Sequence, residues 1–517
     1  MMLVLLIAIP LMGAALAWFS ARLHTKAPFW ISLISLAADL VLALAIWIDL
    51  PLSLIPDVHL QGPWMIEFSY PWVPQLGISI HLALDGLSLI LVTLTAFIGI
   101  IAVVSSWSEI KERIGFFHAN LMFIIAGILG VFLSLDLFLF YFFWELMLVP
   151  MYFLISIWGH ENRVYASTKF FIFTQTGGLL MLVSILGLYF LHGRATGAYT
   201  FDYVQLLGTV LSTSEGLWLM AGFFIAFAIK LPAVPFHTWL ADAHTEAPTA
   251  GSIILAGLLL KTGAYGFLRF VLPLFPEAST IIAYPAMIAG TISILYGASL
   301  AFSQTDLKRL IACTSISHMG FVLLGIFAFN GLALQGAVMQ MVAHAISTGM
   351  LFFLAGALQE RIHTRDITLM GGMWTTAPRM GSVAMIFAIA SLGLPGMGNF
   401  VGEFLVLLGA YRADAAITSV AATGLIAATV YALWMMHTTF FGKSGISLNF
   451  PDLDAREMVV AVVMVIAIVW TGLNPQPLLD TLKDPMDRLQ RIMQSADSIA
   501  HGNNDADSAT SLIGGGR

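Results

Sequence analysis

Four ionisable residues lie inside long apolar stretches of the sequence, where an ordinary surface charge is not expected. They are Glu145, Lys230, Lys261 and Glu403. An ionised side chain at the centre of a bilayer costs at least about 2.5–3.5 kcal/mol, so such residues persist when they are paired, hydrated or used. A structural ion pair, or a lysine that reaches back to the membrane surface, is the simpler alternative. Lys261 lies too deep in its apolar stretch for the second explanation, so proton transfer is the chemistry to consider.

A buried lysine and a movable carboxylate can together form a proton switch. Burial weakens the hold of a lysine on its proton, and a nearby carboxylate strengthens it. A carboxylate that approaches and withdraws therefore gives the lysine two proton affinities. We predict that Glu145 is the partner of Lys230, and that protons pass from Lys230 to Lys261 and on to Glu403.

Histidines could bridge the gaps between these residues. His318 lies in TSISHMGFV and His344 in QMVAHAIST. A neutral imidazole both donates and accepts, so it can pass a proton along, although a structural hydrogen bond to a facing helix is an equally simple role. We predict that His318 and His344 belong to the relay, with His237 a weaker candidate. The three histidines have no metal-ligand spacing among themselves.

The composition indicates the solvent that surrounds these residues. Hydrophobic residues make up 59% of the 517 and charged residues 10%, whereas a soluble domain carries about 25% charged residues. A span needs about 20 mostly apolar residues. The sequence therefore predicts an all-α polytopic membrane protein with about fourteen transmembrane helices, the first of them an uncleaved span. The candidate spans are 2–21, 29–50, 83–106, 115–134, 137–158, 166–191, 216–240, 249–273, 279–301, 308–329, 331–356, 381–411, 416–441 and 457–474.

The charges of the loops predict the orientation. The loops after odd-numbered spans hold most of the lysines and arginines, whereas the opposite loops hold only Arg194, Arg269 and Arg412. Basic loops stay in the cytoplasm, so we expect both termini on the opposite, outer side of the membrane. Asp85 at the start of the third span is expected to be a helix cap.

Two of the spans are interrupted by proline and glycine. The seventh runs into Lys230-Leu-Pro-Ala-Val-Pro235, and the twelfth contains Leu394-Pro-Gly-Met-Gly-Asn399. Such breaks survive at membrane depth only inside protein or beside a wet cavity. Their offset of five spans predicts two inverted five-helix repeats, an architecture of transporters. The predicted organisation is 1–114 (spans 1–3), 115–273 (first repeat, spans 4–8), 279–441 (second repeat, spans 9–13), 457–474 (span 14) and 475–517 (a polar tail with one surface helix near 478–497).

Several classes of function are disfavoured by what the sequence lacks. Cys313 is its only cysteine, which excludes a disulfide within the chain and a cysteine-ligated iron–sulfur cluster. It has no GxGxxG after a strand and no GxxxxGK[ST] phosphate loop. No basic tract suggests a nucleic-acid partner. Any redox or nucleotide chemistry coupled to this chain is therefore expected on other chains.

The segments LPAVPFHTWLADAHTEAPTAGSIILAGLLLKTGAYGFLRF (231–270) and QTDLKRLIACTSISHMGFV (304–322) resemble signatures of a known family, as do FFWELMLVPMYF and SLGLPGMGNFVGEF. This is the family of antiporter-like proton-conducting subunits of respiratory NADH:quinone oxidoreductase (complex I), multisubunit cation/proton antiporters and membrane-bound hydrogenases. The resemblance covers nearly the whole chain. Glu403 stands where the L-type and N-type subunits of complex I carry a lysine, and the chain stops soon after span 14, so we expect a third type of subunit.

The resemblance implies roles for the same residues. Glu145 matches the glutamate of span 5, Lys230 the lysine of broken span 7, Lys261 the central lysine of span 8, and Glu403 the last residue of the half-channel. His318 and His344 match positions between them. The implied partners are the other membrane subunits of complex I, the L-type and N-type included. NADH, FMN, iron–sulfur clusters and quinone would belong to partner subunits, with no cofactor or metal on this chain.

Two other functions use the same buried charges. A subunit of a multisubunit Na⁺/H⁺ antiporter would work without a redox driving force, and a subunit of a membrane-bound hydrogenase or formate hydrogenlyase would use a different one. A purely structural membrane scaffold would pair the charges without titrating them.

Overall fold

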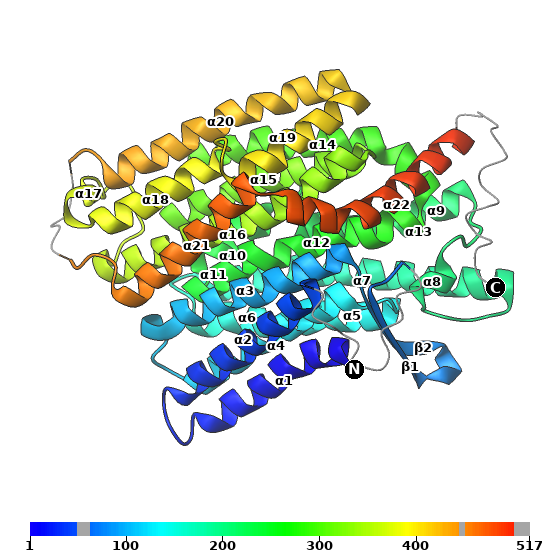
Figure 1. Cartoon of the computed structure of the whole chain (residues 1–517), viewed down its shortest axis with the longest axis horizontal. Coiled ribbons are helices and arrows are strands. Elements are labelled where there is room, and N and C mark those ends of the chain that lie inside the picture. The colour runs from blue at the N-terminus through cyan, green and yellow to red at the C-terminus, as the bar shows by residue number, and fades with distance from the viewer. Residues whose placement is uncertain (49–62, 444–449, 501–517) are drawn as a thin grey trace.

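The computed structural model describes residues 1–48, 63–443 and 450–500, and these are almost entirely helical. Within them, 13 helices are long and apolar enough to cross a membrane, and they run roughly side by side (Figure 1). They are α1 (Met2–Ser20), α2 (Ala27–Trp47), α3 (Gly86–Glu109), α4 (Ile114–Leu133), α5 with α6 (Leu137–Leu146 and Leu148–Trp158), α7 (Arg163–Thr196), α9 (Thr213–Lys230), the segment Thr249–Leu274, α14 (Pro276–Phe302), α15 (Leu307–Phe327), α16 (Gly331–Ile362), α20 (Ala415–Phe440) and α21 (Ala455–Leu473).

The one predicted span that is absent from these 13 is the interrupted twelfth, 381–411. It consists of α18 (Pro378–Ser391) and α19 (Gly398–Ala413), each too short to cross alone, joined by the non-helical residues 392–397. The seventh span is broken in the same way, because α9 ends at Lys230 and α10 (Thr238–Glu246) begins after seven non-helical residues, 231–237. Both predicted breaks are confirmed. The two five-helix repeats and their boundaries stay a prediction.

The first break is closed by side chains that bond its exposed backbone. The indole nitrogen of Trp239 donates to the carbonyl of Ile229 at 2.9 Å. The hydroxyl of Ser293 accepts the amide of Val234 at 3.0 Å. Backbone groups without a partner are not tolerated in lipid, so these bonds allow the helix to end inside the bundle.

Three spans form the centre of the bundle. The apolar stretches of Thr249–Leu274, α15 and α16 are entirely buried. The first of these spans is irregular, because two π-helical turns, η3 (Leu255–Leu259) and η4 (Phe267–Val271), separate the short helices α11 (Thr249–Ile254), α12 (Leu260–Gly266) and α13 (Leu272–Leu274). The other spans surround these three, so polar groups on them face protein and not lipid.

The two ends of the bundle differ. The turn between α1 and α2 and the short helix α17 (Met373–Thr376) lie at one end, here called the basic end because its loops carry most of the lysines and arginines (Figure 1). At this end Trp158 donates to the carbonyl of Glu112, which joins the loop after α6 to the loop after α3. The N-terminus, a β-hairpin and α8 (Tyr203–Leu206) lie at the other end.

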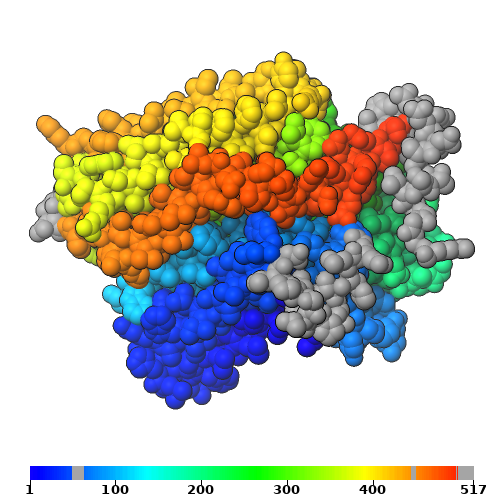
Figure 2. Space-filling model, viewed as in Figure 1, coloured from blue at the N-terminus to red at the C-terminus, as the bar shows by residue number. Residues whose placement is uncertain are grey.

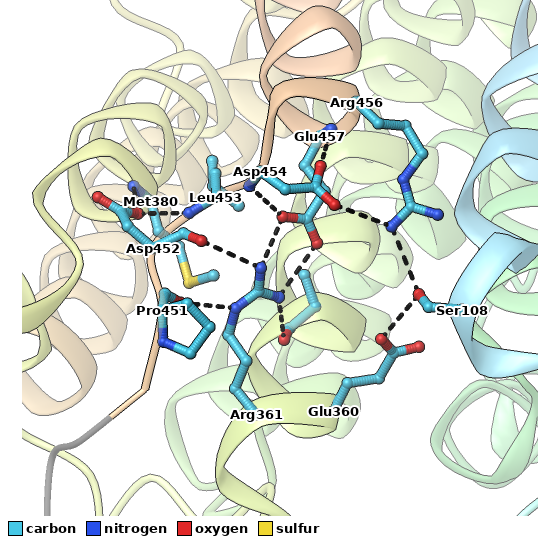
Figure 3. A network of polar contacts seen from close by, with 11 residues as sticks. Ser108, Glu360, Arg361, Met380, Pro451, Asp452, Leu453, Asp454, Arg456 and Glu457 are labelled. Carbon is cyan, nitrogen blue, oxygen red and sulfur yellow. Dashed lines mark hydrogen bonds and ion pairs between the residues drawn. The ribbon is translucent and has the colours of Figure 1, made fainter.

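A network of ion pairs ties several helix ends together at the basic end (Figure 3). Arg361, in the last turn of α16, donates to both carboxylate oxygens of Glu457 at the start of α21, at 2.6 and 3.1 Å. Asp452 accepts the backbone amides of Arg379 and Met380 at the start of α18. The network therefore fixes α16, α18 and α21 relative to one another.

The hairpin was not foreseen from the sequence. Strands β1 (Ile66–Val73) and β2 (Ile78–Leu84) pair antiparallel and are joined by η2 (Pro74–Leu76) and Gly77, whose φ of 67° favours glycine. Asp85 follows directly and accepts the amide of Ser88, which confirms the predicted helix cap. It also forms a buried ion pair with Arg269 at 2.6 Å, which the sequence did not indicate.

The C-terminal helix covers part of the bundle. α22 (Gln476–Ala500) packs against α3, α13, α14 and α16, which confirms the predicted helix in the tail and extends it. In Figure 2, α21 and α22 fill the middle of the visible face, between the N-terminal spans at one edge and residues 373–443 at the other.

A histidine between two carboxylates gives the hairpin a pH-dependent stability. His81 lies 2.5 Å from Asp202 and 2.8 Å from Glu67. Burial alone would lower the pKa of His81, but the hydrogen bonds and charges of Asp202 and Glu67 outweigh burial and raise it. For Asp202, burial alone would raise the pKa, and the contact with His81 lowers it. The histidine contribution is therefore complete below pH about 6.5 and lost as the pH rises through the raised value, whereas the aspartate contribution is lost only in acid.

We expect amide hydrogen exchange in residues 78–84 of the purified protein, corrected for its intrinsic pH dependence, to become less protected above pH about 6.5. The variant His81→Asn should show a flat profile, and the variant of an exposed histidine, His24→Asn, should behave as the parent. A pH profile unchanged in His81→Asn would contradict this account.

The network at the basic end predicts a stability effect. The variant Arg361→Met leaves the buried carboxylate of Glu457 without its partner, so unfolding should become easier by about 3–5 kcal/mol. A thermal melt of the purified protein would show this as a lower Tm. The control Arg163→Met removes an exposed guanidinium that only contacts backbone carbonyls, and it should change stability by at most about 0.5 kcal/mol.

Candidate functional site

Lys261, one of the predicted relay residues, is fully enclosed by the protein. It lies on α12, directly after a π-helical turn, and its side chain has no exposed surface. Its ammonium donates to the carbonyl of Ala256 at 2.6 Å and contacts Nδ1 of His344 at 2.6 Å. A π turn shifts the backbone hydrogen-bond pattern and recurs at functional sites. Here it accompanies a carbonyl, within the turn itself, that holds the lysine.

The two histidines predicted to follow Lys261 lie next to each other. His344 on α16 and His318 on α15 have ring centroids 5.5 Å apart, in an edge-to-face arrangement. Both are buried. Because Lys261 meets Nδ1 of His344, the other nitrogen, Nε2, is left as the group that can exchange a proton further on, and it has no hydrogen-bond partner in the described residues.

His318 reaches Glu403 directly. Its Nδ1 lies 3.0 Å from Oε1 of Glu403, and its Nε2 lies 3.1 Å from both Ser391 and Tyr431. Gln340 also donates to Oε1 of Glu403, at 2.9 Å. The two sides of the imidazole thus meet a carboxylate and a pair of hydroxyls, a position that suits proton exchange.

Glu403 lies across the break in the twelfth span. It is 2% exposed and sits on α19, and its Oε2 has no hydrogen-bond partner in the part of the chain that the structure describes. A Cβ on Gly393, in the break, would stand 2.6 Å from this oxygen, and Gly393 has a φ of 75°. Glycine is therefore required here twice over, by conformation and by the close approach of the carboxylate. The structure brings Lys261, His344, His318 and Glu403 into one line through the buried centre.

Lys230 and Glu145 form a separate group. Lys230, the last residue of α9, is buried, and its ammonium has no hydrogen-bond partner among the described residues. It lies over the rings of Trp144 and Phe170, 5.3 and 5.6 Å from their centroids, which is a cation–π contact. Trp144 precedes Glu145 on α5, yet Glu145 and Lys230 are not within the 4 Å of an ion pair. The predicted pair is therefore seen separated.

Lys230 is linked to Lys261 by backbone packing and not by a chain of polar groups. A Cβ on Gly263 would lie 2.6 Å from the carbonyl of Phe227, 2.8 Å from the amide of Leu231 and 3.1 Å from Cβ of Lys230. Gly263 is two residues after Lys261. The broken end of α9 therefore rests on the helix that carries Lys261.

Other buried polar residues were not singled out from the sequence. His244 on α10 is fully buried, stacks on Phe352 with centroids 4.8 Å apart, and has no partner for either ring nitrogen. Gln340, Ser391 and Tyr431 complete the surroundings of His318. A histidine in a mixed segment such as ADAHTEAP gives no hydropathy signal, so only the packing reveals its burial. His237, the weaker candidate, lies against Tyr296 and outside the line.

No group of three or more His, Cys, Asp or Glu side chains that could hold a metal ion occurs in the described part of the chain. The buried polar groups of the line are instead arranged as donors and acceptors, each within hydrogen-bond reach of the next except between the two histidine rings.

Known proteins resemble this chain over nearly its whole length. Residues 134–429 match the family described as NADH:quinone oxidoreductase/Mrp antiporter, transmembrane. The proteins named NADH-quinone oxidoreductase subunit M of Pseudomonas aeruginosa and Escherichia coli are each 51% identical to it, over 96% and 95% of this chain and 99% and 98% of their own.

Solved structures agree with these relatives. A chain of respiratory complex I from Thermus thermophilus matches with a TM-score of 0.86 and 30% identity, over 95% of this chain and all of that one. A chain of the Mrp complex from Dietzia sp. matches with a TM-score of 0.83 over 96% of this chain and 98% of that one, but at 21% identity it shows the fold alone. The chain therefore belongs to the NADH:quinone oxidoreductase/Mrp antiporter family of membrane subunits.

Proposed function

We propose that this chain is the proton-translocating subunit M of a bacterial NADH:quinone oxidoreductase, and that it moves protons along the buried line from Lys261 to Glu403. The observation that carries the proposal is that line itself. Four ionisable groups, contributed by the segment Thr249–Leu274, α15, α16 and α19, meet at the centre of the bundle, where lipid cannot reach them. The identity of 51% with proteins named subunit M supports the complex to which it is assigned.

The proton steps follow from the contacts. Lys261 gives its proton to Nδ1 of His344, and His344 releases the proton of its Nε2 toward the ring of His318. One water would close the gap between the two rings, which no direct hydrogen bond spans. His318 then passes a proton from Nδ1 to Glu403, whose second oxygen faces the break in the twelfth span. Each imidazole returns to its starting state by rotation or by the next proton, and no net charge stays in the apolar centre.

Changes in the distance between Lys230 and Glu145 would drive proton transfer along the line. When Glu145 approaches, Lys230 holds its proton more strongly. When Glu145 withdraws, as in the observed arrangement, Lys230 releases its proton through water to Lys261, which has given its own proton to His344. The charge that appears or disappears at the end of α9 acts on Lys261 through their shared helix contact at Gly263.

The surroundings of the subunit follow from the same assignment. The electron-transfer cofactors, NADH, FMN, iron–sulfur clusters and quinone, would sit on partner subunits, and the neighbours in the membrane would include the L-type and N-type subunits. With the basic end in the cytoplasm of a bacterial inner membrane, both termini would be periplasmic.

The line predicts uncoupling when one of its members cannot titrate. In the purified complex reconstituted into vesicles, Lys261→Met, His318→Phe and Glu403→Gln should each lower the initial rate of NADH-driven proton pumping by at least about tenfold, since losing one step adds ~1.4 kcal/mol or more to the barrier. Electron transfer to quinone, measured with the gradient collapsed, should remain.

The matched control for His318→Phe is His192→Phe, because His192 is also a buried histidine but bonds only Thr209, away from the line. Normal pumping in an assembled Glu403→Gln complex would exclude the proposed path. Pumping that instead required sodium, without NADH, would favour an antiporter.

The switch predicts that Lys230→Ala and Glu145→Ala each lose most pumping, and that the double variant is no worse than either single one, because both remove the same interaction. The measurement is the ratio of protons pumped to electrons transferred. Pumping left intact by either single change would show that the pair does not drive transport.

The contact at Gly263 predicts that Gly263→Ala lowers pumping as well, because the added methyl would meet the backbone of Phe227 and Leu231, which cannot rotate away. In Gly251→Ala, on the same span, the methyl would have neighbours no nearer than 3.4 Å, so pumping should be retained. Equal pumping in both variants would mean that this contact does not couple Lys230 to Lys261.

A further inference from the structure

An acidic residue that the relay does not use is buried among the first spans. Asp39 lies on α2 and has no exposed surface, and neither of its carboxylate oxygens has a hydrogen-bond partner in the described residues. It stands 12 residues into the helix from the basic end, which is about 18 Å at 1.5 Å per residue. Asp39 is therefore near the middle of the membrane.

Within the described residues, no cation pairs with Asp39. The far end of α2 is bonded to α22, through Trp47 and Thr481. Around Asp39, α2 packs against α1, α3 and α4. The titratable side chains on these three helices are His118, near the start of α4, and Glu109, at the basic end of α3, and Asp39 is the only one on α2. Because the chain itself buries Asp39 completely, a partner subunit cannot reach it either. An unpaired carboxylate is very unfavourable in such a place, whereas the neutral acid is tolerated.

Polar groups lead from Asp39 toward the basic end. Ser32, Ser35 and Asp39 are spaced by three and four residues, so they lie on one face of α2. Ser32 is fully buried, and its hydroxyl has no hydrogen-bond partner within residues 1–48, 63–443 and 450–500. Ser35 lies against α1, where a Cβ on Gly13 would stand 2.6 Å from its hydroxyl.

This row of polar groups ends at His118, a buried histidine near the basic end of the bundle. His118 is 2% exposed, and its Nδ1 has no hydrogen-bond partner among the described residues. Its ring lies 6.2 Å from that of Phe29, one turn before Ser32. Phe29 packs on Trp107. The ammonium of Lys26 lies over the ring of Trp107, 4.5 Å from its centroid. Four unpaired or hydroxyl-bearing groups on α2 and α4 thus follow one another from the basic end to the membrane centre.

This group is separate from the proposed relay. α3 stands between them: a Cβ on Gly99 would meet Leu36 of α2, whereas Ile98, the preceding residue, packs against Gly257 in the span of Lys261. The first spans form one edge of the molecule in Figure 2, away from the central helices.

We propose that Asp39 is a second proton-binding site, held as the neutral acid, whose proton exchanges with the basic end past Ser35, Ser32 and His118. The ligand is the proton itself. Neighbouring hydroxyls and a neutral imidazole can pass it along, with water between them where the spacing exceeds a hydrogen bond.

Infrared spectroscopy of the purified complex tests this site, because a protonated carboxyl has its own carbonyl stretch. The difference between the parent and Asp39→Asn at neutral pH should contain one such band. Asp85→Asn is the matched control, since Asp85 is also buried but is paired with Arg269 at 2.6 Å, and it should remove no such band. If Asp39→Asn assembles poorly, Asp39→Leu should give the same difference in an assembled complex, because it removes an unpaired polar group from an apolar place.

Exchange with the solvent tests the path. After transfer to D₂O the Asp39 band should shift, and in His118→Phe and Ser32→Ala the shift should be at least about tenfold slower, a barrier change of ~1.4 kcal/mol. Absence of the band in the parent would show an ionised carboxylate and overturn the proposal. A band that does not exchange, or that exchanges equally fast in His118→Phe, would overturn it too, since Asp39 would then be a sealed structural acid. Neither readout depends on proton pumping, so failure here leaves the relay proposal untouched.

Discussion

The exclusion of charge from hydrocarbon is the constraint on which this structure depends. Each ionisable group at the depth of the membrane centre must be enclosed by other helices, because exposing it to lipid costs several kcal/mol. Three central spans meet this requirement, because the apolar stretches of Thr249–Leu274, α15 and α16 are entirely buried. The outer spans form a shell that faces lipid. The line from Lys261 to Glu403 exists only because this shell provides an interior.

Inside the shell, deviations from regular helix place the polar groups. The π turn before Lys261 accompanies the carbonyl that holds its ammonium. The break after α9 leaves Lys230 at a helix end, and the break before α19 brings Gly393 against Glu403. Glycine allows close approaches at Gly263 and Gly393, where any larger side chain would push a helix or a carboxylate away. These irregularities are stabilised by specific bonds, such as that from Trp239 to Ile229, so they are built parts of the fold.

Much of this could be read from the sequence. Hydropathy found the spans, and proline and glycine located both breaks, because these signals are local and strong. The four charges and two histidines stood out against apolar neighbours. The hairpin β1–β2 was missed, since the apolar end of β2 runs directly into the third span and strand pairing depends on bonds between two segments. The ion pair of Asp85 with Arg269 and the burial of His244 were missed because their causes lie far away in the sequence.

The sequence by itself determined that the chain is a membrane protein, which residues are ionisable within the spans, and where the helices must break, since length, hydropathy and proline act within a single segment. It also carried the family resemblance. The tertiary structure decided which of those residues meet. It joined Lys261, His344, His318 and Glu403, left Lys230 and Glu145 apart, and isolated Asp39 behind α3. Contacts of this kind depend on how separate helices pack, and a side chain that is charged and useful in one packing would be only a destabilising burden in another.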